Sequence, residues 1–118
     1  MASISTYQKG LWAEIFVAVI YLVHGYRLLA MRYKTGVGEI DLVLRKGENV
    51  IFAEVKARQS LDGALESLTP QMKHRISKAA LHFIAANPRI AAFDMRFDFW
   101  AVRDLSTWRW MKNAWALS

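Results

Sequence analysis

The sequence predicts a mixed α/β domain in which a β-sheet lies between helices. Two segments carry apolar residues at helical spacing, and several short runs rich in β-branched and aromatic residues lie between and after them. The turn residues Lys46-Gly47-Glu48 join two of these runs as a hairpin. With 118 residues, 54% hydrophobic and 22% charged, the chain suits one domain and excludes disorder as its main state. We expect a single domain over residues 1–118, with the element order α-β-β-β-α-β.

The first expected helix covers about residues 5–24 and ends at Gly25, a residue suited to a helix C-terminus. Its apolar residues repeat at helical spacing, which predicts a buried face made of Leu11, Trp12, Ile15, Phe16, Val19, Leu22 and Val23. The longest apolar run covers only residues 11–23 and contains Glu14, whereas a membrane span needs about 20 apolar residues. We therefore expect neither a membrane segment nor a signal peptide, and hence a cytoplasmic protein.

Three strands are expected next, over residues 26–33, 39–45 and 49–57. Residues 59–68 are expected to form a polar, mobile connection. Thr69 and Pro70 then provide the N-cap and the first residue of a second helix that runs to about Ala86. Its expected inner face consists of Met72, Ile76, Ala79, Ala80 and Phe83.

The last strong strand is expected over residues 96–103, and a short aromatic tail follows it. Trp12 and Trp100 fall in core-like patterns, whereas Trp108 and Trp110 would share one face of an edge strand. For the tryptophans, burial or a homodimer contact is favoured over stacking on nucleic-acid bases.

Charge and cysteine content narrow the function further. Sixteen Lys and Arg against ten Asp and Glu give a net charge of +6, which favours a polyanionic partner, nucleic acid first and an anionic membrane surface second. The chain has no cysteine, so disulfide scaffolds, thiolate zinc sites and thiol nucleophiles are excluded.

The expected hairpin carries an unusual group of charged side chains. If the turn is centred on Gly47-Glu48, Asp41 lies opposite Glu54 and Glu39 lies opposite Lys56, all on one face of the sheet. Opposed carboxylates repel each other, so a shared proton or a divalent cation must offset the repulsion. Ligands that offer only oxygen point to Mg²⁺ or Mn²⁺.

The alternative is that these acids are solvated on an open sheet face, with Glu39 and Lys56 as a surface ion pair. Apolar residues flank the acids on both strands and favour a sheet that is covered on both sides: Ile40, Leu42, Leu44, Val50, Ile51, Phe52 and Val55.

An acidic residue followed by Glu-x-Lys on the next strand resembles the signature of the restriction-endonuclease-like nuclease superfamily. More closely, an ordered set of motifs resembles the YraN-like family, whose fold is similar to that of archaeal Holliday-junction resolvases. The set comprises Gly10-x-x-Ala13-Glu14, Gly38-Glu39-Ile40-Asp41-Leu42-Val43, Glu54-Val55-Lys56-x-Arg58, a lysine-bearing second helix and Arg96-Phe97-Asp98. The resemblance implies a restriction-endonuclease-like core.

The resemblance also implies roles for single residues. Asp41 and Glu54 would bind the metal, with Glu14 as a further ligand, directly or through water. Lys56 would orient the attacking water or stabilise the developing charge. Glu39 would be accessory, either pairing with Lys56 or supporting the metal ligands, and Glu14 could instead simply face solvent. Gln59 is a further accessory candidate because it is polar and directly follows the Glu-x-Lys-x-Arg motif, and its alternative is an ordinary loop residue.

The second expected helix carries no acid between residues 71 and 86 and presents a basic stripe fit for a phosphate backbone. The residues expected to bind nucleic acid are Arg58, Lys73, Arg75 and Lys78. No segment is typical of a base-reading helix, so binding is expected to be structure-selective or nonspecific.

The leading hypothesis is a Mg²⁺- or Mn²⁺-dependent endonuclease that hydrolyses DNA phosphodiester bonds, including those of branched DNA. The second is a binding module of the same fold that holds nucleic acid or a protein without cutting. A third, a peripheral membrane protein, is disfavoured because Glu14 interrupts the apolar helix.

Overall fold

A computed structural model describes residues 6–117 of the chain. The order of elements is α1 (Thr6–Val23), β1 (Arg27–Lys34), β2 (Glu39–Lys46), β3 (Asn49–Ala57), α2 (Leu61–Glu66), α3 (Pro70–Ala86), the 3-10 turn η1 (Pro88–Ile90), β4 (Asp94–Asp104) and β5 (Thr107–Trp115).

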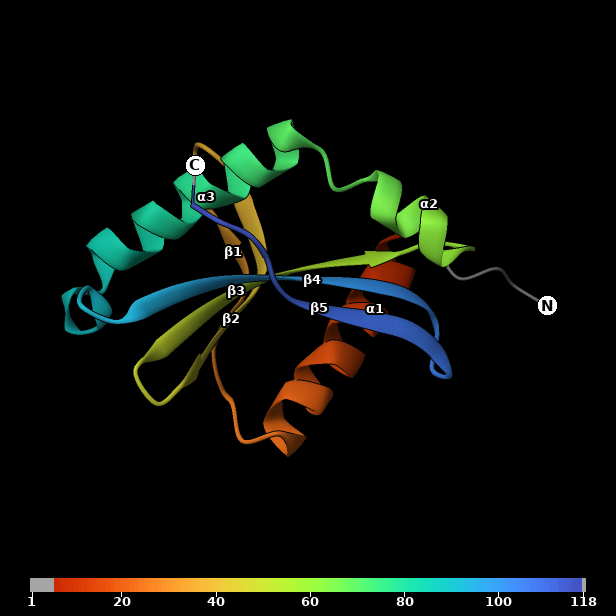
Figure 1. Cartoon of the computed structure of the whole chain (residues 1–118), viewed down its shortest axis with the longest axis horizontal. Helices are drawn as coiled ribbons and strands as arrows, with labels where there is room; N and C mark the ends of the chain where they lie inside the picture. The colour runs from red at the N-terminus through yellow and green to blue at the C-terminus, as the bar shows by residue number, and fades with distance from the viewer. Residues whose placement is uncertain (1–5, 118) are drawn as a thin grey trace.

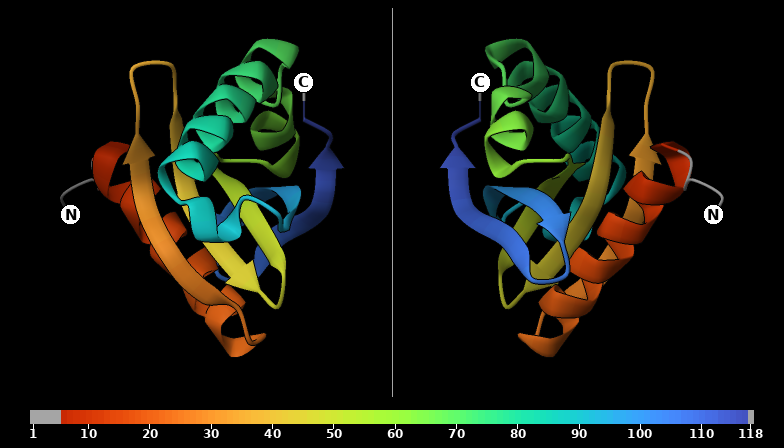
Figure 2. Two further views of the ribbon diagram at one scale, coloured as in Figure 1. Left: turned by 90° about the vertical axis from the view of Figure 1, so that its left-hand side faces the viewer. Right: turned by 90° about the vertical axis from the view of Figure 1, so that its right-hand side faces the viewer.

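The five strands form one mixed sheet in the order β1-β2-β3-β4-β5 (Figure 1). Strands β3 and β4 are parallel, and every other neighbouring pair is antiparallel. Helix α1 packs on one face of the sheet, whereas α2 and α3 pack on the other (Figure 2). The predicted mixed α/β class, with a sheet flanked by helices, is confirmed.

Two segments carry more structure than the sequence indicated. The connection expected over residues 59–68 contains α2, whose N-terminus is capped by the Ser60 hydroxyl, which accepts a hydrogen bond from the Gly63 backbone N–H at 3.0 Å. The aromatic tail is the edge strand β5, which pairs with β4 and adds a second strand after α3. The prediction of a loop over residues 59–68 is therefore wrong for six of its ten residues, which are helical.

The hairpin register follows the prediction. Lys46 pairs with Asn49 and Leu42 with Ala53, so the two-residue turn is Gly47-Glu48. Gly47 has a φ of +61°, a conformation that glycine adopts without steric cost. All the apolar residues expected to flank the acids are buried.

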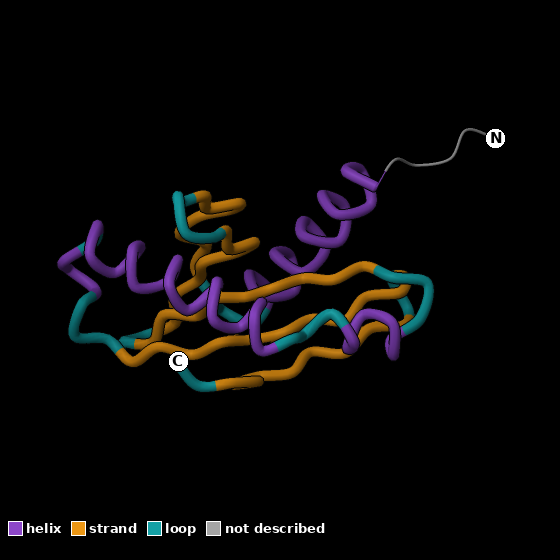
Figure 3. Tube along the Cα trace, turned by 90° about the horizontal axis from the view of Figure 1, so that it is seen from above, coloured by secondary structure: helices purple, strands orange, loops and turns teal. Residues whose placement is uncertain are grey.

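Helices lie on both faces of the sheet (Figure 3), and each face has its own core. The core on the α3 side contains Phe52 and Phe97, with their rings stacked, and the expected inner face of α3, of which Met72 is only partly buried. The core on the α1 side contains Tyr21 and Trp100. These two cores hold the middle strands, β2 to β4, on both faces.

A buried carboxylate ties α1 to strands β4 and β5. Asp98 on β4 is fully buried and accepts hydrogen bonds from the Tyr21 hydroxyl at 2.7 Å, the Trp110 indole at 3.0 Å and the Asn113 backbone N–H at 3.0 Å. The Arg96 guanidinium adds two more at 2.8 Å. The charge is therefore fully paired, as a buried carboxylate requires.

The face of α1 that packs against the sheet differs from the prediction. Ala13, Val17 and Tyr21 are buried, whereas Trp12, Ile15, Val19, Leu22 and Val23 of the expected inner face are 40–78% exposed. Small residues and a hydrogen-bonded tyrosine let the helix lie close to the sheet, and the bulkier apolar residues point outward. None of the described helices is both long enough and apolar enough to cross a bilayer.

Candidate metal and nucleic-acid site

The two predicted acids lie where β2 and β3 separate. The ladder between these strands ends at Leu42 and Ala53, although β3 stays paired with β4 as far as Ala57. Beyond the last pair, the Asp41 carboxylate accepts a hydrogen bond from the Val55 backbone N–H at 2.8 Å. The Asp41 side chain thus occupies a place that a backbone carbonyl would fill in a regular sheet, and the strands open around it.

Asp41 and Glu54 are close enough to affect each other's charge. Burial raises the pKa of Asp41 to about 8, and the neighbouring Glu54 carboxylate adds to the rise by hydrogen bonding and by charge repulsion. The Val55 N–H and Lys56 act in the opposite direction. Glu54 itself is 7% exposed. Without a cation between them, Asp41 therefore keeps its proton to a higher pH than an ordinary aspartic acid.

Glu14 extends this group from the α1 side. It lies 3% exposed, and its Oε2 atom accepts hydrogen bonds from Arg32 Nε at 2.9 Å and Nη2 at 2.7 Å. Burial raises the pKa of Glu14 to about 7 and Asp41 adds to the rise, whereas Arg32 opposes it. The solvent-facing alternative for Glu14 is wrong: the carboxylate points inward and is paired with an arginine.

A backbone irregularity in β1 accompanies this ion pair. Arg32 has a φ of +51° in a strand that otherwise pairs regularly with β2 from Ala30 to Lys34. Such a conformation is uncommon for a residue with a side chain and costs about 1 kcal/mol or more. The ion pair with Glu14 contributes to offsetting that cost.

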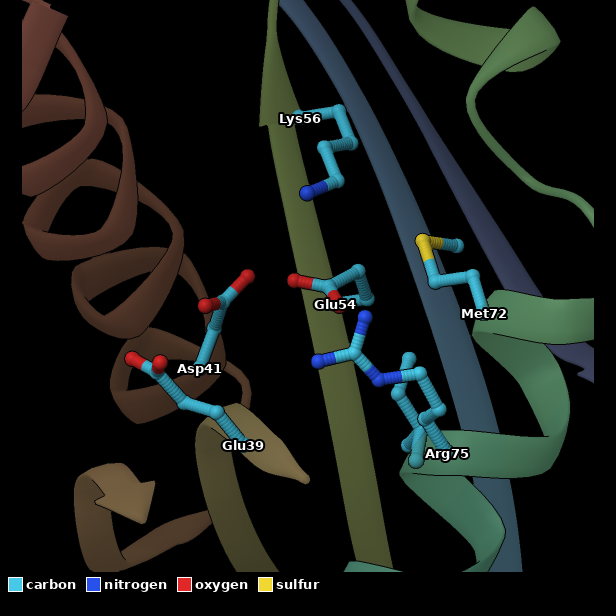
Figure 4. Close-up of a pocket in the computed structure, with 7 residues that line it drawn as sticks. Glu39, Asp41, Glu54, Lys56, Met72 and Arg75 are labelled. Atoms are coloured by element: carbon cyan, nitrogen blue, oxygen red, sulfur yellow. The ribbon is translucent and has the colours of Figure 1, made fainter. Parts of the chain in front are cut away.

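The acids line an open cavity of about 230 Å³, which we call the acid pocket (Figure 4). Its walls come from β2, β3 and α3 and consist of Glu39, Asp41, Glu54, Lys56, Met72, Arg75 and Ile76. In Figure 4 the Lys56 ammonium and the Arg75 guanidinium both point toward Glu54, from opposite ends. Two carboxylates therefore face each other, with a cation at each side.

Lys56 is not held by a close carboxylate. Within residues 6–117 no ion pair joins it to Glu39, Asp41 or Glu54. The expected Glu39–Lys56 surface pair is therefore absent from the described part of the chain, although both side chains line the acid pocket. Lys56 is left available to interact with a bound anion.

Two further cavities adjoin the acid pocket. The helix-side cavity, of about 340 Å³, shares Glu39, Asp41 and Lys56 with it and is also lined by Gly10, Glu14, Arg32, Val55, Ala57 and Arg58. The turn-side cavity, of about 430 Å³, shares Glu39 and Arg75 with it and is also lined by Lys34, Thr35, Gly36, Val37 and Gly38. The three form one path with basic residues along its length and the acids at its centre.

Gly38 allows α3 to lie against this path. A Cβ atom at residue 38 would lie 2.5 Å from the Arg75 carbonyl oxygen, closer than real Cβ atoms approach. The preceding turn is fixed by the Thr35 hydroxyl, which accepts hydrogen bonds from the Val37 and Gly38 N–H groups. The close approach of Gly38 to the Arg75 carbonyl sets the position of α3 relative to the acids.

The remaining predicted residues lie outside the centre. Arg58 lines the helix-side cavity, and Gln59 is exposed beyond the end of β3 and lines none of the three cavities. Lys78 is exposed on α3, and Lys73 is half-buried there, also outside the cavities. Arg75 is the one member of the expected basic stripe on α3 that lines them.

The described residues supply two close carboxylates for a metal but no group of three. Among residues 6–117, no three Asp, Glu, His or Cys side chains are placed to hold one ion. Asp41 and Glu54 are the pair that could bind it, with water or substrate oxygens completing the shell, as is usual for Mg²⁺. Glu14 is paired with Arg32, so in this arrangement it would affect a bound ion only indirectly, through its interaction with Asp41.

Sequence reasoning missed two residues of this region. The pairing of Arg32 with Glu14 depends on a positive φ within a strand, which no local pattern indicates. The close approach of Gly38 to α3 is also a tertiary contact, and its only sequence signal is a glycine directly before Glu39.

Comparisons with known proteins identify the family. Residues 13–102 match the model of a family described as "Uncharacterised protein family UPF0102". The chain is 44% identical over 95 residues to a UPF0102 protein of Bradyrhizobium diazoefficiens, covering 80% of this chain and 71% of the relative. It is 38% identical over 112 residues to one of Parvibaculum lavamentivorans, covering 95% and 84%.

A UPF0102 protein of Paramagnetospirillum magneticum is 40% identical over 114 residues, covering 93% of this chain and 88% of the relative. The matched segment contains Glu14, Asp41 and Glu54, and it also contains Lys56 and helix α3. The resemblance expected from the motifs is confirmed: the chain belongs to the UPF0102, or YraN-like, family.

Proposed function

We propose that this protein is a Mg²⁺- or Mn²⁺-dependent endonuclease that hydrolyses phosphodiester bonds in DNA. The observation that carries the proposal is the pair Asp41 and Glu54, facing each other in an open pocket beside Lys56. A purely structural role would favour neutral or oppositely charged side chains at this point, because buried like charges are costly.

The donor set fits a hard divalent cation. Both acids offer oxygen, neither is paired with an arginine or lysine in the described structure, and their mutual repulsion is what a cation would remove. When bound, such an ion lowers the pKa of water and polarises a phosphate. Asp41 and Glu54 would hold it.

The chain's own cations would hold the substrate. Lys56 projects into the acid pocket and would stabilise negative charge on the phosphoryl oxygens as the bond to water forms. Arg75 would contact a neighbouring phosphate from the α3 side, and Arg58 one from the α1 side. Phosphates would thus be held on both sides of the bond that is cut.

The path formed by the three cavities, which we call the basic path, favours recognition of the DNA backbone over recognition of the base sequence. Its cations come from strands, from Arg58 directly after β3, and from Arg75 on α3. Contacts of this kind position the nucleic acid without reading bases. We therefore propose structure-selective or nonspecific DNA binding, with branched DNA included among the substrates, by a protein that works in the cytoplasm.

A second candidate is a nucleic-acid or protein binding module of the same fold that does not cut. One observation favours it: the described residues provide two close acids and no third. In that case protonated Asp41 beside Glu54, rather than a bound metal, would be the functional state of the site.

Nicking assays on supercoiled plasmid and on a four-way junction test the proposal, each with Mg²⁺, with Mn²⁺ and with EDTA. Cleavage by the wild type that EDTA abolishes, and that Lys56→Ala and Asp41→Asn lose by at least about a hundredfold, supports the nuclease. Lys78→Ala is the matched control, since it removes a cation of α3 outside the pocket. Binding without cleavage supports the second candidate, and equal cleavage by Lys56→Ala indicates a contaminating nuclease.

A further inference from the structure

The outward side of α1 is apolar from Trp12 to Val23. We call the side chains of Trp12, Ile15, Val19, Leu22 and Val23 the outer α1 face; they are 40%, 49%, 51%, 49% and 78% exposed. Trp12, Ile15, Val19 and Leu22 recur every three or four residues and Val23 follows directly, so all five lie on one side of the helix. Exposed apolar residues on a surface are usually scattered, and a continuous row marks an interaction site.

The row continues onto the neighbouring strand. The Trp12 ring stacks on Phe16 at 5.9 Å between centroids, and Phe16 meets Trp108 of β5 edge to face at 6.1 Å. Trp108 is itself 38% exposed. With side chains of roughly 150–250 Å² each, the outer α1 face and Trp108 together expose on the order of 500–700 Å² of apolar surface.

Charge argues against nucleic acid on this surface. Between Gly10 and Val23 the only charged residue is Glu14, and it is buried on the other side of the helix. A phosphate backbone would find no cation there. An amphipathic helix that lies in a lipid surface carries lysines and arginines on its polar face, whereas the opposite side of α1 is packed on the sheet.

We propose that a second copy of this chain covers the outer α1 face, so that the protein is a homodimer built on paired α1 helices. The exposed area approaches the roughly 800 Å² that each partner contributes to a standard interface. A two-fold axis lets one apolar row pack against an identical row, and the spacing of Trp12, Ile15, Val19 and Leu22 is the spacing that packed helix pairs use.

The arrangement leaves the basic path open. Glu14 points to the sheet side of α1 and lines the helix-side cavity, so a partner on the outer α1 face would not cover it. Each protomer would therefore keep its own access to DNA, and dimerisation does not depend on whether the acid pocket is catalytic.

Sedimentation velocity of the full chain across a concentration series tests the proposal. We expect a species of twice the 13.5 kDa chain mass that persists at high salt, because apolar burial is not screened. Leu22→Glu should weaken self-association by at least about tenfold. Leu81→Glu is the matched control: Leu81 is 48% exposed on α3, against 49% for Leu22, and the change should alter association by less than about twofold.

Cross-linking then locates the interface, since the chain has no cysteine of its own. Single cysteines at positions 15, 19 and 22 should include one that forms a disulfide-linked dimer on oxidation, whereas Leu81→Cys should not. A wild-type chain that stays monomeric, or a dimer that Leu22→Glu leaves intact, overturns the proposal. Monomers that bind anionic vesicles through this face would also overturn it and assign the face to lipid.

Discussion

The carbonyl oxygen of Arg75 lies 2.5 Å from the point where a Cβ atom at Gly38 would stand. The start of β2 and the middle of α3 therefore meet backbone to backbone, directly beside the acid pocket. Because a carbonyl within a helix cannot swing aside as a flexible side chain can, the distance between α3 and the acids depends on the absence of a side chain at position 38.

Gly38→Ala should destabilise the protein by about 1–3 kcal/mol, the cost of forcing extra volume into a packed contact. The free energy of unfolding, measured by urea titration, checks this. Gly36→Ala in the same turn is the control, because a Cβ there meets no atom within 4 Å. Equal stability of the two variants would contradict the contact.

Stability in metal-free buffer should fall as the pH rises from about 4 to 8. The pKa of Asp41 is raised to about 8, so across this range the folded state binds more protons than the unfolded state, and stability decreases with pH. Glu14, with a pKa of about 7, acts in the same direction.

Asp41→Asn mimics the protonated acid and should flatten this decline, leaving the variant at least about 1 kcal/mol more stable than the wild type at pH 8, since each pKa unit is worth ~1.4 kcal/mol. Urea unfolding of both proteins at pH 5 and pH 8 measures the difference. A wild type whose stability rises with pH would show that the acids are not held close together.

Mn²⁺ should raise the melting temperature more at pH 8 than at pH 5.5, because the ligands must lose their protons before the ion binds. Glu54→Gln should abolish the shift. Glu14→Gln should keep most of it, since Glu14 is paired with Arg32. Thermal melts with and without the ion test this, and loss of the shift in Glu14→Gln alone would make Glu14 a direct ligand.

Arg75→Ala should weaken DNA binding by roughly 1–2 kcal/mol and reduce the slope of affinity against salt by about one unit, as expected for the loss of a phosphate contact. Lys78→Ala should cost less, because Lys78 lies outside the cavities. Fluorescence anisotropy with a labelled four-way junction at several salt concentrations compares the two. A larger loss of DNA affinity in Lys78→Ala than in Arg75→Ala would indicate that DNA binds on the outer side of α3.

Asp98→Ala should destabilise the fold by about 3–5 kcal/mol, because it leaves Arg96 and three other donors, on Tyr21, Trp110 and Asn113, without this partner. It should not change metal binding in any fraction that still folds. Thermal unfolding gives the first quantity and Mn²⁺-dependent melting the second. A loss of the Mn²⁺ shift with normal stability would link Asp98 to the acid pocket.

The hairpin and its register were predictable from the sequence, because a two-residue turn leaves one alignment of Glu39–Lys46 with Asn49–Ala57. The closeness of Asp41 and Glu54 was predicted from that register, but the ladder ends at Leu42 and Ala53, so the two acids meet beyond it and not as a regular cross-strand pair. The inner face of α3 was predictable for a similar reason, since apolar and basic residues lie on different sides of that helix.

Tertiary structure alone decided which side of α1 meets the sheet, because a helix that is apolar all round carries no periodic signal of orientation. It also decided the pairing of Glu14 with Arg32 and the approach of α3 to Gly38. Each of these joins residues far apart in the chain, and each depends on close packing between elements that no local pattern specifies.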